Sequence, residues 1–450
     1  MASSNPKPPP SGLRRVVRVR REATDSPPAS ALAPDSLALS LLLAARVVAA
    51  VRNGQSLTEA LARLSGEPAG ARAGAQDAAY GVFRHYGQGE FILQRLLSKP
   101  LSHDETVGLL LAALYRLDSR PDAPHTVVDQ AVTAAGELAA GAFKGLVNGV
   151  LRNYLRQRDA LRQAMQQDDV AANAHPAWWL TRLRRAFPDN WAAIVAAGNA
   201  PPPMTLRVNC RKGTRNEYQA RLAELGLTAR PVGKHGLVLS SPVSVDVLPG
   251  FADGAISVQD AGAQRAAELL APAPGARVLD ACAAPGGKTA HLLESADLDL
   301  LALDIDAARC RRIDDTLHRL GLAATVRAAD AAEVASWWDG RPFDAILADV
   351  PCSASGVVRR HPDMKALRRE SDIRPLVRTQ AALLDALWPL LKPGGKLLYA
   401  TCSVFAEENA AQIDAFLFRQ ATATCLHREQ LLPGEDHDGF YYALLRKAAE

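Results

Sequence analysis

No pair of cysteines in this sequence has the spacing of metal ligands. The chain of 450 residues contains six cysteines, none of them in a CxxC pair, which argues against structural zinc. Reduced thiols of this kind are typical of the cytosol. An apolar run long enough to cross a bilayer is also missing, because Leu37–Val51 is short and contains Arg46. Since no hydrophobic signal region follows the first basic residues, we expect a cytoplasmic protein outside the membrane.

Strong charge of one sign is missing as well. The formal net charge is only +4, a mild basic bias that is compatible with RNA binding without proving it. Hydrophobic residues make up 48% and charged residues 22%, so the chain can form large cores and is not globally disordered. Its length predicts several domains.

Two common nucleotide-binding fingerprints are absent from VLDACAAPGGKT, residues 278–289. A Walker A loop would need glycine at Cys282, and GxGxxG does not occur there. The stretch instead begins as an apolar strand, turns tightly at Pro285–Gly287 and enters a helix at Thr289. Such a loop lies at the carboxyl end of a strand, where doubly wound sheets bind cofactors.

The acidic residues that follow later strands favour a nucleoside cofactor. Asp304 ends the apolar stretch LDLLALD and suits the two hydroxyls of an adenosine ribose. Because the fingerprints of ATPases and dehydrogenases are absent, the remaining common occupant of this fold is S-adenosylmethionine.

Three motifs, DACAAPGGKT, DVPCSASGVVRRHPD and YATCSVFAEEN, resemble the signature motifs of RNA cytosine-5 methyltransferases. With the N-terminal helices, the chain resembles the RsmB/Sun (Fmu) branch, which methylates 16S ribosomal RNA, over nearly all residues after about 35. This resemblance implies S-adenosylmethionine as cofactor and small-subunit ribosomal RNA, single-stranded or locally opened, as partner. We expect a monomer. One departure is Val350, where the family motif DAPCS has alanine; the charged and thiol groups are kept.

If the catalytic roles of the family apply to the matching positions of this sequence, Cys402 is the nucleophile and Cys352 is the thiol that assists product release. Addition of a thiolate at carbon 6 of cytosine makes carbon 5 nucleophilic, which explains the need for covalent catalysis. Asp349 is expected to hydrogen-bond the N3/N4 edge of the base, and Lys288 to orient the cofactor or Asp349. The full predicted cofactor site is Cys282, Ala283, Ala284, Pro285, Gly286, Gly287, Lys288, Asp304, Asp306, Arg309, Asp330 and Asp349.

Periodicity and composition predict a multidomain protein. Residues 1–32 form a basic tail, and residues 33–165 form an all-α NusB-like RNA-binding bundle. A small α/β RNA-binding subdomain follows over residues 166–250. Residues 251–450 are expected to form an α/β Rossmann-like methyltransferase domain, in which SVQDAGAQ begins a helix and six segments are strands: VLDAC, LLALD, ATVRAAD, FDAILADVP, KLLYATCS and YYALLRK.

Several sets of basic or aromatic residues allow two interpretations. The tail is either a solvated segment or an electrostatic RNA tether. The helix that begins with FKGLVNGVLRN presents either an RNA-binding edge or an ordinary solvated face; its basic residues are Lys144, Arg152, Arg156, Arg158 and Arg162. Trp178 and Trp179 either stack on bases or, as we expect, pack in a core.

Two further groups of residues also allow two interpretations. Arg207 and Asn209, in the RVN motif, either contact phosphate or bond internally. Residues 359–361 either hold the RNA backbone or form a structural cluster. As alternatives for the whole chain, the same chemistry on transfer RNA and a non-catalytic RNA-binding factor remain; the intact Cys352, Cys402 and glycine loop oppose the latter.

Overall fold

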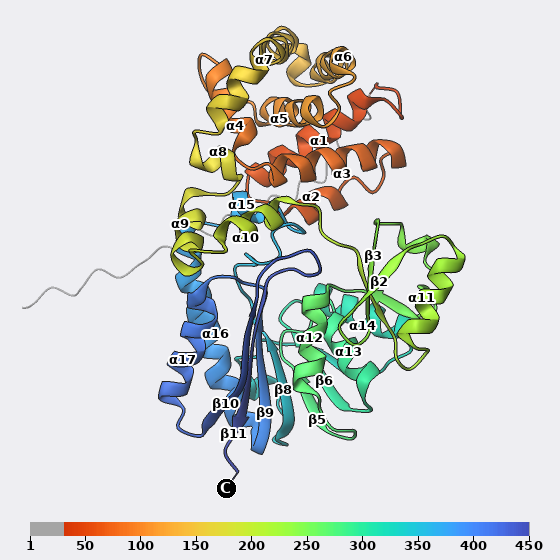
Figure 1. Ribbon diagram of the computed structural model, residues 1–450, viewed down its shortest axis with the longest axis vertical. Helices are drawn as coiled ribbons and strands as arrows, with labels where there is room; N and C mark the ends of the chain where they lie inside the picture. The colour runs from red at the N-terminus through yellow and green to blue at the C-terminus, as the bar shows by residue number, and fades with distance from the viewer. Residues whose placement is uncertain (1–30, 450) are drawn as a thin grey trace, which may run out of the picture.

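The computed structural model describes residues 31–449, in a helical domain, a small sheet domain and a larger α/β domain (Figure 1). The predicted basic tail, residues 1–32, lies outside the described residues except for its last two positions. Within the described range, none of the helices combines the length and apolarity needed to cross a membrane.

The helical domain is a bundle around α1, which is buried on nearly every side. The helix begins where Ser36 Oγ accepts a hydrogen bond from the Leu39 amide, 3.1 Å away, as an N-cap. Its apolar sequence explains the central position, because a helix without a polar face must be surrounded. The bundle confirms the predicted all-helical domain. Its helices are α1 (Leu37–Arg52), α2 (Leu57–Ala62), α3 (Ala69–Arg84), α4 (Gln88–Leu96), α5 (Asp104–Ser119), α6 (Pro124–Ala135) and α7 (Lys144–Met165).

Three helices connect the bundle to the rest: α8 (Asp169–Asn173), α9 (Ala177–Ala186) and α10 (Trp191–Asn199). Trp179 on α9 is buried, and its ring lies 5.3 Å from that of Phe405. This tryptophan therefore packs in a core, as expected.

The small domain has an antiparallel sheet in the order β2-β3-β1-β4, with α11 (Arg215–Glu224) packed on it. The stretch SVQDAGAQ was expected to open a helix at Ser257. Ser257 instead belongs to a strand, and α12 (Ala261–Leu270) begins only after Asp260, whose side chain caps it. The strands are β1 (Thr205–Val208), β2 (Ala229–Val232), β3 (Gly236–Leu239) and β4 (Ile256–Val258).

The large domain has a sheet in the order β10-β11-β9-β8-β5-β6-β7. The five strands from β9 to β7 are parallel, whereas β11 and β10 run antiparallel. The strands are β5 (Arg277–Asp280), β6 (Asp299–Asp304), β7 (Thr325–Ala328), β8 (Phe343–Asp349), β9 (Leu391–Thr401), β10 (Ala423–Leu431) and β11 (Phe440–Lys447).

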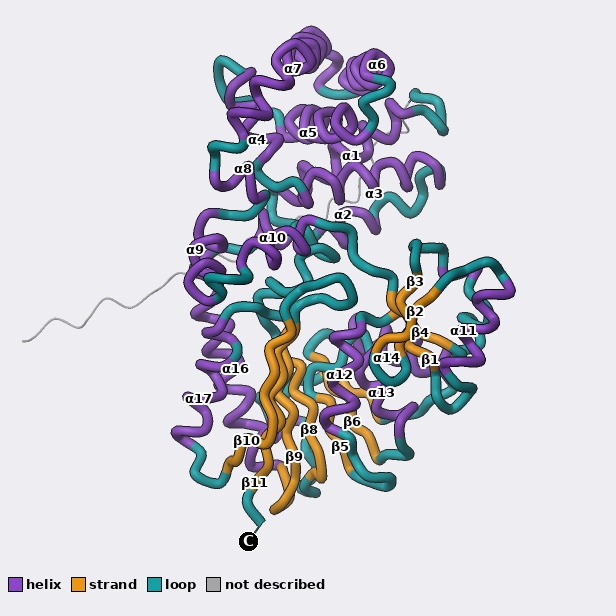
Figure 2. The backbone as a smooth tube through the Cα atoms, viewed as in Figure 1, coloured by secondary structure: helices purple, strands orange, loops and turns teal. Residues whose placement is uncertain are grey.

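Helices cover both faces of this sheet (Figure 2). On one face α12, α13 (Gly287–Ser295) and α14 (Ala307–Leu320) form a core with the strands, and on the other α16 (Ile373–Leu387) and α17 (Ala410–Arg419) do so. The predicted strands are all present, but the sequence reading missed β10. That edge strand is mostly exposed or half-buried, so it has no apolar alternation to reveal it.

The loop after β8 seats the helical domain on the large domain. The Leu57 amide, at the start of α2, donates to Asp363 Oδ2 at 2.9 Å. Lys365, in the short helix α15 (Met364–Leu367), is buried and donates to the Arg84 carbonyl at 3.0 Å and to Asn199 Oδ1. The same loop contains Cys352, so it connects the thiol region to the bundle.

Candidate functional site

The predicted catalytic and cofactor residues lie along one edge of the large sheet. Asp280, Asp304 and Asp349 end β5, β6 and β8, and Cys402 directly follows β9. Since these strands are parallel neighbours, their carboxyl ends share one edge. Asp349 pairs in register with Ala400, which brings the PCS and TCS segments next to each other.

The two thiols are in contact. Cys352 Sγ lies 3.3 Å from Cys402 Sγ; Cys352 is 9% exposed and Cys402 is half-buried. The hydrogen bond with Cys402, burial and the charges of Cys402 and Glu408 raise the pKa of Cys352 well above its usual value. Cys352 is therefore held in its neutral thiol form.

Lys288 binds Asp349, with Nζ 2.5 Å from Oδ2. Burial lowers the pKa of Lys288, but the adjacent Asp349 charge and hydrogen bond outweigh it, and the pKa is raised. The ammonium also lies 5.7 Å from the centre of the Phe440 ring. Two roles were expected for Lys288, and its ion pair with Asp349 supports the second, the orientation of Asp349.

The turn between β5 and α13 has the conformation that its glycines predict. Gly286 has φ 95°, in the left-handed region, and α13 begins at Gly287. The Ala284 amide donates to Asp304 Oδ2 at 3.3 Å, so the turn and the end of β6 are joined. Arg309 lies 3.4 Å from Asp304, and Asp306 caps α14.

The residues at this edge fit S-adenosylmethionine. Asp304 offers a carboxylate for ribose hydroxyls, and Asp330 follows β7 on the same edge. The buried Asp280 Oδ1 has no hydrogen-bond partner within the described residues, and burial raises the pKa of Asp280 to about 7. A polar atom left without a partner beside the glycine turn is expected where a ligand completes the site.

Residues 359–361, one of the groups left open, are largely used inside the protein. Arg359 is 3% exposed and pairs with Asp438; Arg360 pairs with Asp438 and, at 2.8 Å, with Asp260. These contacts support the structural reading for both arginines.

Arg207 is also internal, at 1% exposure. Its guanidinium makes two 2.8 Å hydrogen bonds to Glu294 on α13 and one of 2.8 Å to the Gly287 carbonyl, and Asn209 donates to the Gly254 carbonyl. The RVN motif therefore joins the small sheet to the first turn of α13.

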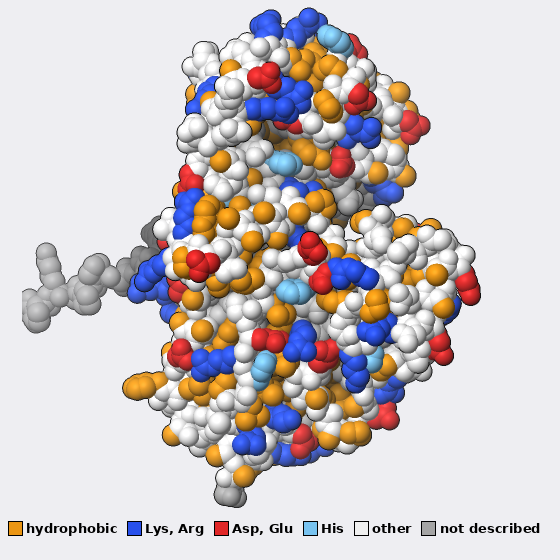
Figure 3. Space-filling view, viewed as in Figure 1, with side chains coloured by type: hydrophobic (Ala, Val, Ile, Leu, Met, Phe, Trp, Pro, Cys, Tyr) orange, Lys and Arg blue, Asp and Glu red, His pale blue; other side chains and the backbone are white. Residues whose placement is uncertain are grey.

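On α7 the predicted basic edge is partly neutralised. Arg158 and Arg162 lie 2.7 and 2.9 Å from the same Asp118 oxygen, whereas Lys144 and Arg152 are exposed. Over the face seen in Figure 3, basic and acidic side chains are interspersed.

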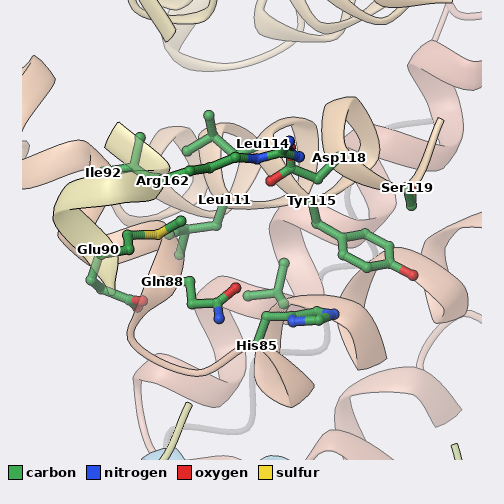
Figure 4. A pocket seen from close by; sticks show the side chains of 13 residues that line it. His85, Gln88, Glu90, Ile92, Leu111, Leu114, Tyr115, Asp118, Ser119 and Arg162 are labelled. Carbon is green, nitrogen blue, oxygen red and sulfur yellow. Dashed lines mark hydrogen bonds and ion pairs between the residues drawn. The ribbon is translucent and has the colours of Figure 1, made fainter. Parts of the chain in front are cut away.

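A cavity of about 290 Å³ lies within the helical domain, between α3, α4, α5 and α7 (Figure 4). Figure 4 shows Arg162 beside Asp118 at one side and His85 and Tyr115 at the other. Neither the thiols nor the glycine turn line this cavity. It is therefore separate from the candidate catalytic site.

Two side chains near the thiols, the half-buried Arg368 and the fully buried Glu408, had no predicted role. Arg368 donates to the carbonyls of Cys352 and Ser353, at 3.3 and 3.2 Å. Glu408 accepts hydrogen bonds from the Ser353 amide and from Ser403 Oγ. Glu408 lies in YATCSVFAEEN, so the motif contained the residue, but a sequence pattern does not reveal which groups a carboxylate joins.

Comparison with known proteins agrees with this architecture. Residues 267–446 match the model of the 16S rRNA methyltransferase RsmB/F family, residues 175–246 that of an RsmF/B-like ferredoxin-like domain, and residues 39–156 that of the NusB family. Ribosomal RNA small subunit methyltransferase B of Pseudomonas putida is 46% identical over 428 residues, covering 91% of this chain and 98% of the relative. The protein of the same name from Vibrio cholerae is 45% identical, covering 83% and 88%.

Solved structures share the fold. The crystal structure of PH0851 superposes with a TM-score of 0.76 at 24% identity, covering 91% of this chain and 99% of that one. NSun6 from Pyrococcus horikoshii, solved with SFG, gives a TM-score of 0.55 at 21% identity and covers 61% and 99%. With close relatives spanning nearly its whole length, the chain belongs to the RsmB/F family of 16S rRNA methyltransferases that carry a NusB domain.

Proposed function

We propose that this protein methylates carbon 5 of a cytosine in small-subunit ribosomal RNA through a covalent adduct between Cys402 and carbon 6 of the base. The proposal rests on the two thiols, 3.3 Å apart beside the Lys288–Asp349 pair. Methylation of an amine, a hydroxyl or an exposed nitrogen needs no thiol pair, whereas carbon 5 must first be made nucleophilic.

S-adenosylmethionine supplies the methyl group when bound. Asp304 would hold its ribose hydroxyls, Asp330 would bind the adenine amino group, and the turn of residues 282–287 would contribute to its site. The family assignment and the solved NSun6 structure with SFG support this choice of cofactor.

The chain's own groups then act in sequence. The Cys402 thiolate, its proton lost to solvent, forms the S–C6 bond, and the electron pair of the C5–C6 bond makes carbon 5 nucleophilic. Asp349, held by Lys288, hydrogen-bonds the N3/N4 edge of the base and stabilises the adduct.

After the adduct forms, Cys402 is an uncharged thioether. Two of the causes that raise the pKa of Cys352, the hydrogen bond with Cys402 and its charge, are then gone. Once carbon 5 carries the methyl group, Cys352 loses its proton to solvent and its thiolate takes the remaining proton from carbon 5. The C5–C6 double bond then forms again, and the S–C6 bond breaks to return the Cys402 thiolate. Because these thiols are partly buried, the base must be unstacked to reach them. One chain supplies every group, so the proposed catalytic unit is a monomer.

The test incubates Cys352→Ala and Cys402→Ala separately with cellular RNA and S-adenosylmethionine and resolves the products on a denaturing gel. An RNA–protein adduct in Cys352→Ala and none in Cys402→Ala is expected, and sequencing the trapped RNA identifies the target. An adduct that depends on Cys352 would reverse the two roles. Trapped transfer RNA would move the substrate assignment, and the absence of both adduct and methyl incorporation by the unmodified protein would reject the proposal.

A further inference from the structure

Glu408 is a fully buried carboxylate between the two thiol segments. It lies in the short 3₁₀ turn Ala406–Glu408, six residues after Cys402, and is 0% exposed. An ionised carboxylate in the interior is costly unless hydrogen bonds or a cation compensate it. Glu408 therefore requires an explanation that the proposed chemistry alone does not give.

Its two oxygens bind the residues that directly follow the two cysteines. The Ser353 amide donates to Oε1 at 2.8 Å, and Ser403 Oγ donates to Oε2 at 2.6 Å. Gln380 joins the same network, donating to Oε1 at 3.1 Å and to the Pro351 carbonyl at 3.0 Å. Within residues 31–449 these side-chain donors are all neutral, so hydrogen bonds rather than a cation compensate the carboxylate.

The rest of the network joins the two segments directly. The hydroxyls of Ser353, Ser355 and Ser403 lie 3.0–3.2 Å apart, and the Gly356 amide donates to the Cys402 carbonyl at 2.9 Å. With both loops attached to one carboxylate, a shift of either loop breaks a buried hydrogen bond.

We propose that Glu408 is a positioning residue that fixes the separation of the Cys352 and Cys402 thiols by holding the residue after each cysteine. This inference rests on the proposed covalent function. Glu408 does not touch the base; it acts through Ser353 and Ser403. Its negative charge is also among the causes that raise the pKa of Cys352, which keeps that group a thiol while Cys402 attacks.

Glu408→Gln tests the idea, because glutamine has the same shape but one of its two terminal groups cannot accept a hydrogen bond. In a Cys352→Ala background, the rate of adduct formation is expected to fall about tenfold to a hundredfold, as for misplaced reacting groups elsewhere, while RNA affinity stays unchanged. Glu407→Gln is the matched control: Glu407 is the preceding residue, half exposed and paired with Arg182 at the surface, and its loss should leave the adduct rate unaltered.

A second readout separates positioning from general stability. In a Cys402→Ala background, the pH profile for alkylation of Cys352 by iodoacetamide should move to lower pH in Glu408→Gln, because removing a nearby negative charge lowers the pKa of the thiol. Glu408→Asp keeps the charge but is one methylene shorter, so it should slow the adduct without moving that profile. It also carries the test should the glutamine variant not fold.

An unchanged adduct rate together with an unmoved alkylation profile in Glu408→Gln would overturn the inference. Absence of any adduct in the Cys352→Ala parent would instead reject the proposed function. The two failures are therefore distinguishable.

Discussion

Replacing Arg207 by alanine should destabilise the protein strongly without weakening its binding to RNA. The Arg207 and Glu294 side chains are 0% and 1% exposed, and two parallel hydrogen bonds of 2.8 Å join them. Removing one partner of a buried pair leaves an uncompensated charge, which costs about 3–5 kcal/mol. The change also takes the donor from the Gly287 carbonyl, in the first turn of α13.

The assay is urea unfolding of Arg207→Ala, of Glu294→Leu and of the double variant Arg207→Met/Glu294→Leu. We expect the double variant to lose less free energy of unfolding than either single variant, because no buried charge remains. If Arg207 instead contacted an RNA phosphate, its loss would reduce the slope of log affinity against log salt concentration by ~0.9 or slightly less. A loss below about 1 kcal/mol, accompanied by such a change in slope, would refute the internal role of Arg207.

Three more changes test other parts of the structure. Burial and the charge of Lys365 lower the pKa of His175 to about 3 in the folded protein. In the unfolded chain this histidine has a pKa near 6.5, so below that pH the unfolded state binds one proton more than the folded state. The free energy of unfolding should therefore fall by about 2 kcal/mol between pH 7.5 and 5. Urea unfolding should show this loss reduced in His175→Asn, and an equal loss in both proteins would contradict the assignment. Asp363→Ala leaves the Leu57 amide without its acceptor, costing about 1–3 kcal/mol; hydrogen exchange should quicken at α2 but not at α7, and unchanged exchange would disprove the capping role. Lys288→Gln removes the ion pair of Asp349, so kcat for methyl transfer should fall at least about tenfold at unchanged RNA affinity; a rise in KM for RNA alone would point to a substrate contact instead.

The arrangement at the sheet edge was predictable because it depends on regular geometry. Residues that end neighbouring parallel strands must meet at one edge, so Asp304, Asp349 and Cys402 could be placed together from strand patterns and chain order alone. The apolar period of α1 likewise indicates a buried helix before any partner is known.

The fate of the arginines could not be predicted from the sequence. Arg207 meets Glu294 87 residues later, and Arg359 meets Asp438 79 residues later. Whether a guanidinium faces solvent or a distant carboxylate depends on how whole domains pack, which no local pattern encodes. The same holds for Glu408, whose hydrogen bonds join the loop after β8 to the loop after β9. For Val350, where the family motif has alanine, the structure shows a buried side chain that packs in the hydrophobic core of the large domain.

The contacts between the helical domain and the loop after β8 have a consequence for the order of assembly during synthesis. The Leu57 amide donates to Asp363, 306 residues further along the chain, and the Arg84 carbonyl accepts a hydrogen bond from Lys365, 281 residues later. The bundle leaves the ribosome before the α/β domain and has its own core, but the contact that fixes its orientation forms only after the first four strands of the large sheet, β5 to β8, have emerged. The first part to fold is thus among the last to be docked, and the segment that docks it is the same one that carries Cys352.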